Sequence, residues 1–251
     1  MYIQNEERFE MVLKSNELIQ RSRFSLTTNQ QKIVLYLISK LNYKDTEFKE
    51  IEIDIKDFCD VCGIELNSGR RYNEIKNSIK QIADKSMWIE KQNGDETLVR
   101  WIEKPTIRKN NGTITLKLDE DLKPYLLNLK ERYTEYSLIY TLPMKSKYSI
   151  RLYELLKSKH YNKKLKYSIN YNLQEFKKSI DAEKYNSFKD FRKRVLEKAI
   201  EEINKYTDII VEYKTIKSGK AINEIEFIIE TKENYKRFET AIENERGLID
   251  E

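Results

Sequence analysis

The residues from 187 to 208 read SFKDFRKRVLEKAIEEINKYTD, and their types and order favour contact with an anion. A helix N-terminus carries a partial positive charge, so acidic side chains usually occupy its first turn and basic ones its last. Here the order is reversed, because cations crowd the start and most carboxylates come later. The early cations are Lys189, Arg192, Lys193 and Arg194. The helix gives up a little stability to keep them there, which predicts an anionic partner at that end.

A helical projection of this segment separates a core face from a charged face. The apolar positions that share one face are Phe188, Phe191, Val195, Ala199 and Ile203. The outer face holds Lys193, Arg194 and Glu197, with Lys189 and Lys198 at its sides. Arg192 falls near the apolar arc, so its direction stays open. A simpler alternative is that these cations only solvate a surface helix.

Composition describes a folded protein with regional basicity. The 251 residues suffice for one large domain or two small ones, and 39% hydrophobic residues supply the cores. The net charge is only +5, but residues 145–166 hold eight Lys and Arg against the single carboxylate of Glu154. Such a local excess is typical of a protein that meets a polyanion, and a well-solvated lysine face is the alternative explanation.

The sequence shows no secretion signal at its start and no apolar run of roughly 20 residues, so we expect a cytoplasmic protein. Cys59 and Cys62 have a C-x-x-C spacing, but zinc needs four ligands and His160 is the one histidine of the chain. We therefore expect no metal and no other cofactor. Ile55, Phe58 and the two cysteines instead have the spacing of the inner face of a short helix.

The chain repeats one order of elements. The first copy has a helix from Thr28 with a Thr28–Gln31 capping box, an extended stretch at 48–54, a short helix at 55–64, a helix at 68–85 and strands at 87–91 and 97–118. The second copy has a helix at 146–160, an extended piece at 165–171, a short helix at 172–180, the opening segment and a hairpin at 208–230. Phe58, Ser68 and Trp88 correspond to Phe176, Ser187 and Ile209 at a nearly constant separation. A connecting helix at 119–130 then places a boundary near Glu131, which gives domains 1–131 and 132–251.

Three helices followed by a hairpin form the winged-helix plan, in which the third helix enters the major groove of DNA. We therefore predict an α+β fold of two tandem winged-helix domains related by internal duplication. Arg on such a helix can bond guanine, and Lys can neutralise phosphate. The candidate DNA-binding residues are Ser187, Lys189, Arg192, Lys193, Arg194 and Lys198 on the second third helix, Arg70, Arg71, Asn73 and Asn77 on the first, Arg108, Lys109, Lys217 and Lys220 at the hairpins, and Lys145 and Lys147 in the basic stretch.

Three segments together resemble the iteron-binding plasmid replication initiators, the Rep proteins built of tandem winged helices. They are KSNELIQRSRFSLTTNQQKIVLYLISKL, YTEYSLIYTLPMKSKYSIRLYELLKS and FKDFRKRVLEKAIEEINKYTDIIVEYKTIKSGKAINEIEFIIE. The resemblance implies binding to directly repeated origin DNA, with the C-terminal winged helix as the main reader through Lys189, Arg192, Lys193 and Arg194. It also implies an N-terminal domain that dimerises and contacts DNA a second time, and dimers that repress the initiator's own promoter. The chain departs from the family at Lys198, where proline is common, and at Lys220, where arginine is common.

The residues do not favour an enzyme. A nicking initiator needs a tyrosine beside a pair of metal-binding histidines, and this chain has only His160. The sequence also contains no G-x-x-x-x-G-K-[ST] phosphate loop, so ATP hydrolysis is equally unsupported. Origin opening would then depend on binding energy and on host initiator, helicase or primase proteins. Two alternatives remain: a tandem winged-helix transcription regulator without a replication role, and a protein-interaction scaffold. We assign no role to the amphipathic segment after Glu230.

Overall fold

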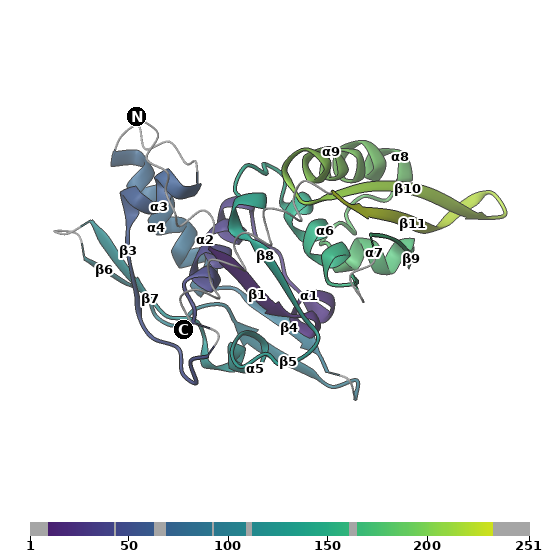
Figure 1. Cartoon of the computed structure of the whole chain (residues 1–251). Helices are drawn as coiled ribbons and strands as arrows, with labels where there is room; N and C mark the ends of the chain where they lie inside the picture. The colour runs from purple at the N-terminus through teal and green to yellow at the C-terminus, as the bar shows by residue number, and fades with distance from the viewer. Residues whose placement is uncertain are drawn as a thin grey trace.

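The computed structural model describes residues 10–42, 44–62, 69–91, 93–108, 112–160 and 165–232, with side chains from residue 73 onward in the helix that begins at 69. Two halves of mixed helices and strands lie side by side (Figure 1). None of the helices in these ranges is both long and apolar enough to cross a membrane.

The second half is a winged helix. Its elements are α6 (Lys147–Lys157), β9 (Lys166–Asn172), α7 (Leu173–Ser179), a third helix, and the hairpin of β10 (Ile209–Ser218) and β11 (Ala221–Thr231). The third helix consists of α8 (Phe188–Phe191), a π-helical turn η4 (Arg192–Leu196) and α9 (Glu197–Tyr206). Strand β11 lies between β10 and β9 and is antiparallel to both, so β9 anchors the wing. The hairpin reaches well beyond the helices (Figure 1).

The first half contains the same connectivity. Its elements are α2 (Thr28–Ser39), β3 (Ile51–Asp54), α3 (Ile55–Cys62), α4 (Gly69–Ala83), β6 (Thr106–Arg108) and β7 (Thr113–Leu116). Strand β7 lies between β3 and β6, as β11 lies between β9 and β10. The predicted pair of winged helices is therefore confirmed.

A second hairpin separates the third helix of the first half from its wing. It consists of β4 (Ser86–Glu90) and β5 (Glu96–Arg100), which form their own sheet with β2 (Ser22–Arg23). The predicted match of Trp88 to Ile209 is therefore wrong, because the outer wing strand that corresponds to β10 is β6. Alternating apolar residues identify strands in a sequence, but they do not show which strands pair.

The segment between the two modules is less helical than expected. Residues 119–130 form only the short η2 (Glu120–Leu122) and α5 (Lys123–Leu126). The chain leaves α5 at Leu127, whose backbone is extended, and then turns at Asn128 and Arg132, whose φ angles of 52° and 53° are left-handed. Strand β8 (Tyr133–Ser137) follows and pairs with β1 (Met11–Ser15), ahead of the short η3 (Leu138–Tyr140). The division into 1–131 and 132–251 stays a prediction.

Helix α2 begins at Thr28 as predicted, but its capping box lies one residue earlier than predicted. Thr27 is its N-cap, and the Thr27 side chain and Gln30 form the capping box. The sequence TTNQQ fits the box in two registers, which explains the shift by one. Thr28 and Gln31, the pair that the sequence predicted for the box, form other hydrogen bonds. The Thr28 hydroxyl donates to the carbonyl of Lys145 at 2.9 Å, and the Gln31 amide donates to the carbonyl of Lys147 at 3.1 Å.

Helix α3 has the inner face that the sequence predicted. Ile55, Phe58, Cys59 and Cys62 are all buried, and the ring of Phe58 packs edge-on against Tyr36 of α2 at 5.2 Å. The C-x-x-C spacing thus belongs to the core of the first half.

Two buried carboxylates fix α6 to its neighbours. Glu154 accepts hydrogen bonds from Lys14 at 2.8 Å and from the hydroxyl of Tyr136 at 2.6 Å, which ties α6 to β1 and β8. Asp208 lies between α9 and β10 and accepts from the hydroxyl of Tyr153 at 2.8 Å. Because Asp208 is fully buried, this bond holds the third helix and the wing root against α6.

Candidate nucleic-acid interface

The third helix of the second half, α8–η4–α9, buries the face that the sequence predicted. Phe191, Val195, Ala199 and Ile203 are at most 1% exposed, and Phe188 is half-buried. Leu196 is also fully buried, which the helical projection missed. The π-helical turn explains the difference, because a π turn holds one more residue than an α-helical turn and directs two successive side chains inward.

The predicted cations of this helix all lie on its exposed side. They are Lys189, Arg192, Lys193, Arg194 and Lys198, and Ser187 at the N-cap is exposed as well. Arg192, which the projection left open, points outward and forms an ion pair with Glu197, Nε to Oε1 at 3.3 Å. The start of the helix is thus a basic surface of the kind that meets phosphates and base edges.

The wing extends this basic surface. Lys217 and Lys220 flank the tip of the hairpin, where Ser218 pairs with Ala221 across a two-residue turn. Gly219 has a φ of 63°, a left-handed conformation that tight hairpin turns need and glycine adopts without strain. Both lysines are exposed. An additional exposed lysine, Lys214, lies opposite Glu226, which offsets its charge.

The equivalent helix of the first half, α4, presents a weaker version of this surface. Asn73 and Asn77 are exposed one turn apart, as predicted, and Lys76 and Lys80 are exposed beside them. Sequence reasoning missed these two lysines, although their spacing of one helical turn is the signal that could have found them. Arg108 is exposed at the end of β6. The side chains of Arg70 and Arg71, and residue Lys109, lie outside the described part.

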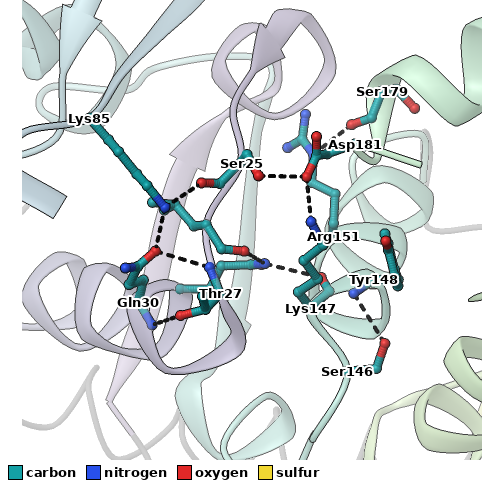
Figure 2. A network of polar contacts seen from close by, with 12 residues as sticks. Ser25, Thr27, Gln30, Lys85, Ser146, Lys147, Tyr148, Arg151, Ser179 and Asp181 are labelled. Carbon is teal, nitrogen blue, oxygen red and sulfur yellow. Dashed lines mark hydrogen bonds and ion pairs between the residues drawn. The ribbon is translucent and has the colours of Figure 1, made fainter. Parts of the chain in front are cut away.

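Lys145 and Lys147 lie at the junction between the two halves. Lys147 forms an ion pair with Asp181, which also accepts a hydrogen bond from the hydroxyl of Ser25 at 2.7 Å (Figure 2). The backbone N–H of Lys145 donates to Glu202 of α9 at 3.0 Å. A carboxylate therefore offsets the charge of Lys147, and DNA contact by either lysine stays a prediction.

Arg151 holds the same junction from the other side. Its guanidinium donates to the carbonyls of Ser179 and Ser22, each at 2.9 Å, and lies 4.7 Å from the ring centre of Phe24. Burial lowers the pKa of Arg151 to about 10, so the side chain keeps its charge at neutral pH. Lys85 of the α4–β4 turn donates to the carbonyl of Ser25 at 2.8 Å (Figure 2). Charged side chains thus fix the two basic surfaces relative to each other.

Two family matches cover most of the chain. Residues 11–157 match the family described as "Initiator Replication protein, WH1", and residues 172–229 match "Initiator Rep protein, WH2". The chain belongs to this family of replication initiators. The second match contains the whole third helix and nearly all of the wing, so the basic surface lies within the part of the chain that matches the family.

Two relatives of this chain come from Escherichia coli. A "PI protein" is 30% identical over 148 residues, which are 53% of this chain and 48% of the relative. A "Replication initiation protein" is 26% identical over 207 residues, which are 79% of this chain and 63% of the relative. The chain thus spans between about half and just under two thirds of the length of these relatives.

A solved structure has the same fold as this chain. The crystal structure of Pi initiator protein in complex with iteron DNA has a TM-score of 0.74 and 21% sequence identity. The match covers 90% of this chain and 99% of that one. The tandem arrangement of the two winged helices is therefore shared along almost the whole chain.

Proposed function

We propose that this chain is a plasmid replication initiator that binds directly repeated origin DNA sequence-specifically. The observation that carries the proposal is the row of exposed cations at the start of the third helix of the second half, beside a wing with lysines at its tip. These cations oppose the helix dipole, which an anionic partner compensates. The likeness to an initiator solved with iteron DNA supports duplex repeats as that partner.

The proposal divides the work between the two predicted domains. Domain 132–251 is the main reader of DNA, through the exposed cations of its third helix. Domain 1–131 makes the auxiliary DNA contact through α4, whose exposed side carries Asn73 and Asn77. Asn can bond adenine bidentately, so α4 is suited to a second, weaker reading of the repeat.

Domain 1–131 also supplies the surface for a homodimer that represses the initiator's own promoter. Trp88 and Leu98 are cross-strand neighbours on the β4–β5 hairpin and are 48% and 50% exposed. Among the described strands, β5 pairs only with β4, which leaves one of its edges for another strand. An antiparallel pairing of β5 with a second copy, centred on Leu98, brings Glu96 opposite Arg100 of the copy. Opposite charges across such a pair stabilise it.

The oligomeric state of surface variants tests this dimer. We expect Leu98→Lys to shift the protein from dimer to monomer in analytical ultracentrifugation, because it places two like charges together at the two-fold axis. Ile210→Lys changes an apolar side chain of 41% exposure on β10 and is the matched control. An unchanged dimer in the Leu98 variant would place the interface elsewhere.

Replication itself needs more than binding. We propose that DNA binding energy opens the origin and that host initiator, helicase or primase proteins are recruited to the opened site. A protein that acts on origin DNA works where that DNA is, so a cytoplasmic location is part of this proposal.

A replication assay tests the function directly. A replicon without its own initiator, carrying the DNA that flanks this gene, should replicate when the wild-type chain is supplied in trans. The Lys193→Ala/Arg194→Ala double variant should fail to support it. Repeat binding by the wild type without any replication would instead indicate a transcription regulator.

A further inference from the structure

The π-helical turn in the third helix gives Arg192 a partner that an unbroken α-helix would not. In an α-helix, side chains three or four residues apart are neighbours, so Glu197 would face Lys193 or Arg194. The π turn η4 adds a residue and brings position 192 beside position 197. The Nε of Arg192 lies 3.3 Å from Oε1 of Glu197, and both side chains are half-exposed.

A tyrosine of the wing lies near this pair. Tyr213 of β10 is half-buried. Burial raises the pKa of its hydroxyl, the carboxylate of Glu197 raises the pKa further, and the guanidinium of Arg192 lowers it. Both charges therefore lie within electrostatic range of the Tyr213 hydroxyl. The pair therefore lies near the middle of strand β10.

Arg192 makes the ion pair through Nε, and this choice of atom decides which of its donors remain for DNA. A contact through Nε engages the inner part of the guanidinium and leaves the two terminal amino groups as donors. These groups can bond O6 and N7 of a guanine side by side. A side chain that becomes ordered on binding loses conformational entropy. A carboxylate that holds the inner part of the guanidinium orders Arg192 before binding, so less entropy is lost when DNA binds.

We propose that Glu197 is a positioning residue that holds Arg192 in the orientation for reading a guanine. This inference rests on the proposed function and adds to it a determinant of sequence specificity. It gives Glu197 two effects of opposite sign. Its negative charge repels every phosphate, which weakens binding to all DNA, whereas its hold on Arg192 strengthens binding to the cognate repeat.

Variants of the full chain separate these two effects. The measured quantities are dissociation constants for a duplex with one cognate repeat, selected from random DNA, and for a scrambled duplex of the same composition. Glu197→Ala should bind scrambled DNA as tightly as the wild type or more tightly, and should lower the cognate preference about 5-fold. Glu201→Ala removes the same charge from an exposed position one turn further along and is the matched control. We expect it to change both affinities equally.

Modified bases connect the effect to Arg192. Replacing each guanine of the repeat in turn by 7-deazaguanine removes the N7 acceptor. At one position this replacement should weaken the wild type and leave Arg192→Ala unchanged. Glu197→Ala should show a reduced response at that same position. The double variant should discriminate no worse than Arg192→Ala alone, because Glu197 acts through Arg192.

Three outcomes would overturn the inference. If Glu197→Ala tightens binding to both duplexes equally, as expected of Glu201→Ala, then Glu197 only repels phosphates. If its loss of preference adds to that of Arg192→Ala, it does not act through Arg192. If the wild type itself selects no repeat, the proposed function fails together with the inference, whereas the first two outcomes leave that function intact.

Discussion

Lys193 and Arg194 are the exposed residues on which sequence discrimination should depend most. We expect Lys193→Ala or Arg194→Ala to cost about 1 to 3 kcal/mol on the cognate repeat, because a side chain that contacts a base carries discrimination as well as charge. Arg70→Ala and Arg71→Ala should cost less, since α4 has the weaker basic start. Titrations of each variant with cognate and scrambled duplexes check this.

Melting temperatures of the same four variants provide the stability control. Lys193 and Arg194 are exposed and lie beyond the first turn of the third helix, so their removal should leave the melting temperature nearly unchanged. If the Arg70 and Arg71 variants lost discrimination while the Lys193 and Arg194 variants kept it, the roles would be reversed. The first domain would then be the main reader and the second would make the auxiliary contact.

Tyr136 and Tyr153 make the fold sensitive to alkali. Burial, and then the neighbouring carboxylates of Glu154 and Asp208, raise their pKa values well above the usual 10.0. Above pH 10 the unfolded chain therefore loses protons that the folded chain keeps, and the free energy of unfolding falls by up to about 1.4 kcal/mol per pH unit for each phenol. Burial lowers the pKa of Lys14, which acts in the opposite direction only up to its ordinary value of 10.5.

Urea unfolding at a series of pH values tests this linkage. Tyr136→Phe should be less stable than the wild type at pH 7, because Glu154 loses a buried hydrogen bond. Above pH 10.5 its free energy of unfolding should fall less steeply than that of the wild type. Tyr133→Phe, at an exposed position, should leave the slope unchanged. Equal slopes for the wild type and the Tyr136 variant would contradict the assignment.

At the scale of elements, the wing should bind DNA without reading it. Lys217 and Lys220 lie at the tip of the long hairpin, and both side chains are exposed. Replacing both by Ala should weaken binding about equally on cognate and scrambled duplexes and reduce the salt slope by about 0.9 per lost phosphate contact. A loss confined to the cognate duplex would show that the wing reads bases.

The elements were predictable from the sequence where one signal decides them. The inner face of α3 and the core face of the third helix follow from apolar spacing, and both are confirmed. The π turn was not predictable, because Val195 and Leu196 are both apolar and ordinary helical spacing accounts for only one of them. The inserted β4–β5 hairpin was missed for a related reason: strand patterns do not specify partners.

At the scale of the whole molecule, the junction was the least predictable part of the site. Lys147 looked like a member of a basic surface, yet it forms an ion pair with Asp181. Arg151 lies on α6 in the same basic stretch and is buried against backbone carbonyls of both halves. These contacts join residues far apart in the chain, and no local pattern of charge or spacing indicates them.

The central claim is that the third helix of the second half selects one repeated DNA sequence. Selection from a library of random duplexes, with the wild type and the Lys193→Ala/Arg194→Ala double variant in parallel, tests it most directly. We predict that the wild type enriches a single motif, which also recurs as direct repeats beside the gene, and that the double variant enriches it weakly or not at all. Equal enrichment of the same motif by both proteins, or no motif with the wild type, would contradict the claim.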